Sequence, residues 1–222
     1  MKILFFGDSI TDAGRRKERG IPWQTQYDYG CGFVRCIATK LFRDPSIKCE
    51  IVNRGLSSNV LADLYARIRP DVWNEKPDVL SILVGINDVW RYIDDEWNEI
   101  YVDHFESLYR IMIEQTKQLF PDIKIILCEP YVIKGAAVNA TPEMPDRFER
   151  FCRVYKYAKA VKRLAEKTGS FFLPLQEKFS AAEKTPEVSL YTDDGVHPHL
   201  LGAEMIADEW IKLFKEKVLT EN

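Results

Sequence analysis

A serine with the surroundings of a nucleophile stands near the start of the chain, in Gly7-Asp8-Ser9-Ile10-Thr11, directly after an apolar run. A serine at a strand-to-helix turn exposes its hydroxyl, and its own N–H lies near a helix N-terminus. Both features suit attack on a carbonyl carbon. The alternative is that Ser9 or Asp8 only caps a helix.

A partner for this serine is found in Asp194-Gly195-Val196-His197-Pro198, before the last helical pattern. A general base that works near neutral pH is most often histidine, and Asp194 can reach back over one turn to hold the imidazole of His197 in one tautomer. The alternative is a simple helix-entry turn. Of the two other histidines, we expect His104 to be exposed in mid-helix without a role, and His199 is too weak a partner to predict a metal site with His197.

Two further motifs follow apolar runs and could stabilise an oxyanion. In Asn53-Arg54-Gly55, the glycine lets a substrate approach the backbone N–H, and in Gly85-Ile86-Asn87-Asp88 the Asn87 amide can donate to developing negative charge. An ordinary turn glycine and an Asx turn or helix cap are the alternatives.

The elements that must position these residues are short buried strands alternating with amphipathic helices. The strands are predicted at 2–6, 49–53, 79–84, 124–128 and 170–173. Continuous apolar strands indicate a parallel sheet that is covered on both faces. Apolar residues at helical spacing predict helices over 101–119, 148–165 and 206–218. The order predicts an α/β fold, a doubly wound sheet with ligands at the C-terminal ends of its strands. Segments 15–29 and 131–145 read as long irregular loops, which are often functional.

The composition fits one domain over residues 1–222. The 31 basic and 34 acidic residues give a net charge of −3, without the basic surface of a nucleic-acid binder. Five cysteines without a C-x-x-C pattern predict reduced thiols and a cytoplasmic chain. We expect no membrane span and no signal peptide, because the first apolar run has only four residues.

Taken together, the four motifs resemble the Ser, Gly, Asn and His blocks of the SGNH/GDSL hydrolase family, in the same order across positions 7 to 197. The resemblance implies a three-layer α/β/α sandwich with a five-stranded parallel sheet, flavodoxin-like in type. It also implies roles for the motif residues: Ser9 as nucleophile, His197 as its base, Asp194 as the residue that orients His197, and Ser9, Gly55 and Asn87 as oxyanion donors. The chain departs from the family after Gly55, where Leu56-Ser57-Ser58 replaces a frequent second glycine, and at His199, where Thr or Ser is frequent.

The sequence therefore predicts a serine esterase that needs no cofactor or metal and acts on a small-molecule ester. Aromatic residues near the loops favour a short acyl group on a carbohydrate or other small alcohol; they are Trp23, Tyr27, Tyr29, Trp90, Tyr92 and Tyr131. The basic run 15–19 could instead steer an anionic substrate, so an acyl-coenzyme A thioesterase or a lysophospholipase is the alternative. A non-catalytic binding domain on the same fold is a third possibility.

Overall fold

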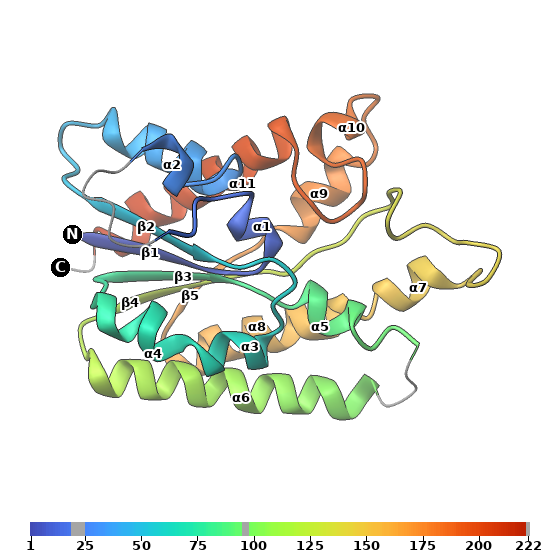
Figure 1. Ribbon diagram of the computed structural model, residues 1–222, viewed down its shortest axis with the longest axis horizontal. Coiled ribbons are helices and arrows are strands. Elements are labelled where there is room, and N and C mark those ends of the chain that lie inside the picture. Colours follow the sequence, from blue (N-terminus) through green and yellow to red (C-terminus); the bar gives the residue numbers. More distant parts are fainter. Residues whose placement is uncertain (19–24, 95–97, 221–222) are drawn as a thin grey trace.

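The computed structural model describes residues 1–18, 25–94 and 98–220. Its centre is a five-stranded parallel sheet in the order β2-β1-β3-β4-β5 (Figure 1). The strands are β1 (Lys2–Gly7), β2 (Glu50–Gly55), β3 (Val79–Leu83), β4 (Lys124–Cys128) and β5 (Phe171–Leu173). The predicted doubly wound α/β class is confirmed, and each predicted strand lies within two residues of the observed one.

The strands that matter for function end level with one another. Gly7 at the end of β1 is paired with Gly55 on β2 and with Leu83 on β3. Sequence order reverses around β1, since β2 lies on one side of it and β3 on the other. At such a point the crossover helices leave toward opposite faces and a crevice opens above the strand ends.

Helices cover both faces of the sheet (Figure 1). One layer holds α1, α2, α9, α10 and α11, and the other holds α3 to α6 and α8. Their bounds are α1 (Ser9–Asp12), α2 (Phe33–Phe42), α3 (Leu61–Ala66), α4 (Ile68–Asp71), α5 (Ile86–Trp90), α6 (Asn98–Leu119), α7 (Arg147–Phe151), α8 (Val154–Thr168), α9 (Gln176–Ala182), α10 (Val188–Tyr191) and α11 (Leu200–Leu213), with short turns η1 (Gln26–Asp28), η2 (Trp73–Glu75) and η3 (Phe214–Val218).

The predicted helix over 148–165 is instead two helices, α7 and α8, separated at Cys152 and Arg153. The break changes the phase of the apolar stripe. Val154 and Tyr157 are fully buried, whereas Tyr155, placed on the stripe by its spacing, is 37% exposed. The C-terminal pattern likewise starts earlier than predicted and ends in the π-type turn η3.

One hydrophobic core runs along both faces of the sheet, and residues 3–6 of β1 are completely buried. Burial on both faces explains why this strand reads as an unbroken apolar run. No helix among the described residues is long and apolar enough to cross a membrane.

Candidate active site

Ser9 is the first residue of α1, directly after the end of β1. The chain turns sharply at Asp8, whose Oδ1 accepts a hydrogen bond from the backbone N–H of Ile10 at 3.0 Å and so caps the helix. This capping role was one alternative for Ser9 or Asp8, and it falls to Asp8. The Ser9 hydroxyl is left free to reach the loop before α11, where its Oγ lies 2.8 Å from Nε2 of His197.

His197 and Asp194 lie in the loop between α10 and α11. Nδ1 of His197 is 2.5 Å from Oδ2 of Asp194, so the carboxylate holds the ring with Nε2 toward Ser9. The other carboxylate oxygen accepts the backbone N–H groups of Val196 and His197, both at 2.8 Å, and the Thr192 hydroxyl at 3.1 Å. The structure therefore brings the three predicted residues together in one continuous hydrogen-bonded chain.

The charges of this pair reinforce each other. Burial alone would raise the pKa of Asp194, but its hydrogen bonds with the His197 ring and backbone hold that pKa well below its usual range. The hydrogen bond to Asp194 raises the pKa of His197 above its ordinary value, against the opposing effect of partial burial. Asp194 thus stays ionised and stabilises the imidazolium that forms when His197 takes a proton.

A second loop holds the one that carries Asp194 and His197. The backbone N–H groups of Ile133, Ala136 and Ala137 donate to the carbonyls of residues 195, 193 and 194. The hydroxyl of buried Tyr131 donates to the carbonyl that precedes His197, at 3.0 Å. The two loops meet at Gly135, where a Cβ atom would lie 2.1 Å from the nitrogen of Gly195. Part of the irregular segment 131–145 is therefore a support for the base.

Asn87 is the second residue of α5, just beyond the end of β3. Its Nδ2 donates to the backbone carbonyl of Asn59 at 3.1 Å, which fixes the amide plane. An amide nitrogen carries two donors, so one N–H remains for an oxyanion. The side chain therefore does not cap α5, since the Asn59 carbonyl that it binds lies on another loop.

Gly55 does not present its N–H to the site as predicted. That N–H donates to Oδ1 of Asn53 at 2.8 Å in a buried hydrogen bond. The glycine is needed for a different reason: a Cβ there would lie 2.2 Å from the backbone nitrogen of Asp12, so only glycine lets α1 pack on the end of β2. The expected donor role of Gly55 is therefore corrected to a packing role.

Ser58, three residues further on, was missed as a site candidate. Its φ of 66° lies in the left-handed region that favours glycine, and its carbonyl accepts from Arg91 at 3.2 Å. Within the described part of the chain its backbone N–H has no hydrogen-bond partner, and the neighbouring Asn59 carbonyl holds Asn87. The signal in the sequence was the absence of a second glycine after Gly55. The turn still needs a residue with positive φ, Ser58 takes that place, and such strained residues often lie at functional sites.

Asp8 is a buried carboxyl beside the triad. Burial raises its pKa to about 7, although the N–H of Ile10 and the nearby His197 act in the opposite direction. Its Oδ2 is buried without a hydrogen-bond partner among the described residues. Near neutral pH this group therefore carries a proton for part of the time.

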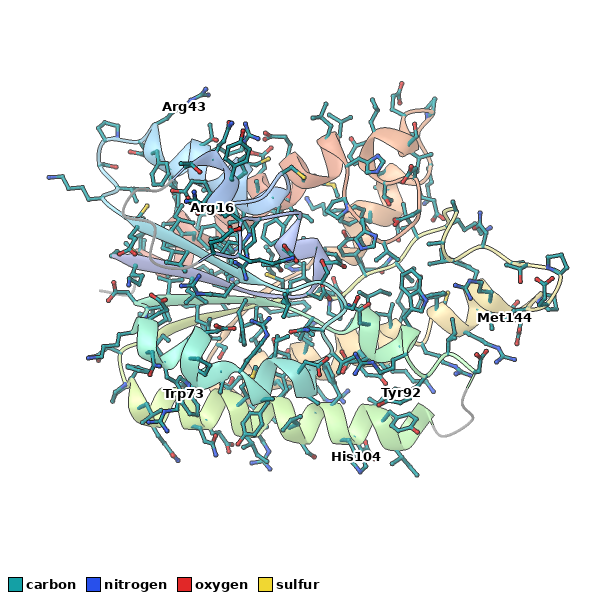
Figure 2. The ribbon with its side chains drawn as sticks, viewed as in Figure 1. Arg16, Arg43, Trp73, Tyr92, His104 and Met144 are labelled. Carbon is teal, nitrogen blue, oxygen red and sulfur yellow. The ribbon has the colours of Figure 1, made fainter. Side chains whose placement is uncertain are left out.

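The remaining candidates lie elsewhere. His199 is engaged with Asp193, at 3.1 Å, and not with His197. His104 is exposed on α6, on the side of the molecule away from α1 (Figure 2), as predicted. Within residues 1–18, 25–94 and 98–220, no three His, Cys, Asp or Glu side chains gather to form a metal site.

The aromatic residues expected to border the site divide into two groups. Tyr29 and Tyr131 are buried in the core, Tyr131 stacked on Phe179. Trp90 is half-buried against Phe151, and Tyr92 is 36% exposed. Tyr27 is also exposed, and Trp23 lies outside the described residues.

A serine, a histidine and an aspartate in this geometry, at the switch point of a parallel sheet, define a serine hydrolase. The chain matches the model of the GDSL-like Lipase/Acylhydrolase family over residues 5–205 and belongs to that family. The chain is therefore an ester-hydrolysing enzyme, and the third possibility, a non-catalytic binding domain, does not apply.

The chain is similar to the acetylxylan esterase of Geobacillus stearothermophilus, at 34% identity over 95% of this chain and 92% of that one. The crystal structure of that esterase has a TM-score of 0.78, with 33% identity over 95% and 92% of the two chains. A GDSL-like lipase from Parabacteroides merdae ATCC 43184 has a TM-score of 0.83, with 34% identity over 95% and 94%. Catalytic mutants of the Geobacillus esterase replace a serine, a histidine or an aspartate by alanine, the same three residue types gathered here.

Proposed function

We propose that this enzyme removes acetyl groups from a carbohydrate through an acyl-enzyme on Ser9. The observation that carries the reaction is the unbroken chain from Ser9 through His197 to Asp194, at 2.8 and 2.5 Å. The support for the substrate is the similarity to an acetylxylan esterase over nearly the full length of both chains.

The reaction follows from the geometry. Nε2 of His197 takes the Ser9 proton as Oγ attacks the ester carbonyl carbon, and the C=O electron pair moves onto oxygen. The N–H groups of Ser9 and Ser58 and the Asn87 amide surround that oxygen. The tetrahedral intermediate collapses and the C–O bond to the alcohol breaks, with the His197 proton passing to the leaving oxygen. Water activated by the same nitrogen then releases the acid and restores Ser9.

The basic run offers little support for the anionic alternatives. Arg15 Nε donates to the carbonyl of Gly55 at 2.8 Å, and Arg16 is paired with Asp28. Lys17 Nζ lies 3.1 Å from the buried carboxylate of Asp12. These three cations therefore neutralise or brace the protein itself, which favours a neutral sugar ester over acyl-coenzyme A.

The test compares initial rates on acetylated xylo-oligosaccharides, acetylated glucose, p-nitrophenyl esters of increasing chain length, acetyl-coenzyme A and a lysophospholipid. We expect the highest kcat/KM on an acetylated sugar and a fall from acetate to longer acyl chains. A higher kcat/KM on the thioester or the lipid would replace the proposal by that alternative.

We also propose a cytoplasmic location for the enzyme. The support is that all five cysteines carry free thiols, as expected of a reducing compartment. Fractionation of the source cells with antibody detection tests it, and recovery in the secreted fraction would contradict it.

A further inference from the structure

Arg67 connects the nucleophile side of the site to the oxyanion side, although it touches neither Ser9 nor Asn87. It stands between α3 and α4 and is only 15% exposed. Its guanidinium lies over the ring of Phe6 in β1, 4.5 Å from the ring centre. The charge is balanced by Asp71, whose Oδ2 accepts from Nη1 at 2.6 Å.

The same group binds the ends of two strands. Nη2 donates to the carbonyl of Gly7 at 3.1 Å, and Nη1 donates to the carbonyl of Arg54 at 2.9 Å. Gly7 stands two residues before Ser9, and its carbonyl also accepts the backbone N–H of Leu56 at 3.0 Å. Arg67 thereby fixes the last peptide before the nucleophile turn and the start of the loop after β2.

The third group held by Arg67 is the residue that orients the oxyanion donor. Nε donates to Oδ1 of Asn59 at 2.7 Å, while the backbone carbonyl of Asn59 accepts the Asn87 amide at 3.1 Å. Asn59 also follows Ser58, whose N–H is the other loop donor. The Arg67 guanidinium is therefore connected to Asn87 through Asn59, by two hydrogen bonds. It also binds the carbonyl of Gly7, two residues before Ser9.

We infer that Arg67 is a positioning residue that, through Asn59, sets the placement of the Asn87 amide relative to the Ser9 hydroxyl. The inference rests on the proposed function, because it needs Asn87 to act on the reacting ester. The planar fork of arginine supplies donors in three directions at once, and an ammonium at this place would reach only part of the set. The contrasting role is a purely structural clamp that holds α3 and α4 against the sheet.

Four proteins separate these roles: wild type, Arg67→Lys, Asn87→Ala and the double variant. If Arg67 acts through Asn87, Arg67→Lys lowers kcat by about 10–100-fold, since a misplacement on the order of 1 Å can have that effect. KM should change little. In the Asn87→Ala background the same substitution should lower kcat by no more than about threefold, because coupled residues are not additive.

Two more variants serve as control and as replacement. Arg163→Lys changes an arginine of α8 that braces this helix against α6 through Glu106, away from the site, and it should keep wild-type kcat. Asn59→Ala removes the acceptor of Arg67 Nε but keeps the carbonyl that holds Asn87. Asn59→Ala should also lower kcat, and it replaces Arg67→Lys in the test if that variant does not fold.

The outcomes are distinct. All rates are measured at temperatures below the unfolding midpoints. If Arg67→Lys lowers kcat by the same factor in the wild-type and the Asn87→Ala backgrounds, Arg67 is only a structural clamp. Unchanged kcat in Asn59→Ala would break the proposed connection as well. A wild-type protein without ester turnover, or an Asn87→Ala variant with normal kcat, would overturn the proposed mechanism itself and the role of Arg67 with it.

Discussion

Ser9 and Asn87 follow the ends of two hydrogen-bonded strands, whereas Asp194 and His197 lie in a loop between α10 and α11 that belongs to no strand. The first pair is held by the register of β1 on β3, in which Gly7 is opposite Leu83. The second pair is held by four hydrogen bonds from segment 131–137.

The difference shows that the two halves of the site have different weak points. Strands buried on both faces cannot shift without breaking many ladder bonds, so the nucleophile half should respond mainly to changes of side chain. The loop half depends on contacts between two loops far apart in the sequence, so it should respond to changes that separate their backbones. Substitutions in each half of the site should distinguish these two kinds of weak point.

Replacement of the nucleophile should have the largest effect. Ser9→Ala removes the attacking oxygen and should lower kcat by about 10⁴–10⁶-fold. The unfolding midpoint should be almost unchanged, because among the described residues the serine hydroxyl bonds to His197 alone. Turnover of p-nitrophenyl acetate and thermal unfolding on the same preparation measure both. Ser46→Ala, in an exposed turn, is the control. Retention of a tenth of wild-type kcat would remove Ser9 from its role.

Loss of the oxyanion donor should follow. Asn87→Ala should lower kcat by about 10²–10³-fold and leave KM nearly constant, since charge on the carbonyl oxygen develops in the transition state. Asn74→Ala, on an exposed residue of η2, is the matched control. A lower unfolding midpoint with normal kcat would show that the amide only braces Asn59, and would leave Ser9 and Ser58 as the donors.

The loop half is tested by Gly135→Ala. The added Cβ would meet backbone atoms of Asp194 and Gly195 within 2.6 Å, so the loops must separate and move His197. We expect kcat to fall by ~10–100-fold. Gly169→Ala is the control: its φ of 61° strains any side chain, which costs about 1 kcal/mol, but it caps α8 far from the triad. If both variants lose stability and both keep kcat, the loop contact does not position the base.

The smallest expected effect is a pH shift in Asp8→Asn. Because the pKa of Asp8 is raised to about 7, its ionisation in the folded state is unfavourable, and wild-type stability should fall as pH rises from about 4 to about 7. Asparagine does not titrate, so the variant should gain in relative stability over that range. Asp8 also helps to raise the pKa of His197. Activity needs neutral His197, so the acidic limb of kcat/KM should move to lower pH in the variant.

Unfolding at pH 5 and pH 8, together with kcat/KM from pH 5 to 9, measures both parts of the Asp8 prediction. An identical acidic limb in the two proteins would show that the charge of Asp8 does not reach His197. A constant stability difference between pH 5 and pH 8 would show that the carboxyl titrates as an exposed group.

Sequence patterns were enough to predict the strands, the order of the motifs and the candidates Ser9, Asp194, His197 and Asn87. These are local properties: apolar runs predict buried strands, and polar residues after them fall at one edge of a parallel sheet. The prediction that Tyr155 is buried was wrong. Helical spacing assumes one continuous helix, and the turn between α7 and α8 rotates the buried face of the second helix relative to the first.

Tertiary contacts determine what spacing leaves open: the role of Gly55, the left-handed turn at Ser58, the support of His197 by segment 131–137 and the place of Arg67. Each depends on atoms from segments that are distant in sequence: Gly55 against Asp12, Gly135 against Gly195, Arg67 against Gly7 and Asn59. Spacing along a chain reports which residues share a strand or a helix face. It does not report which backbone N–H already has a partner, because that is settled by the approach of another segment.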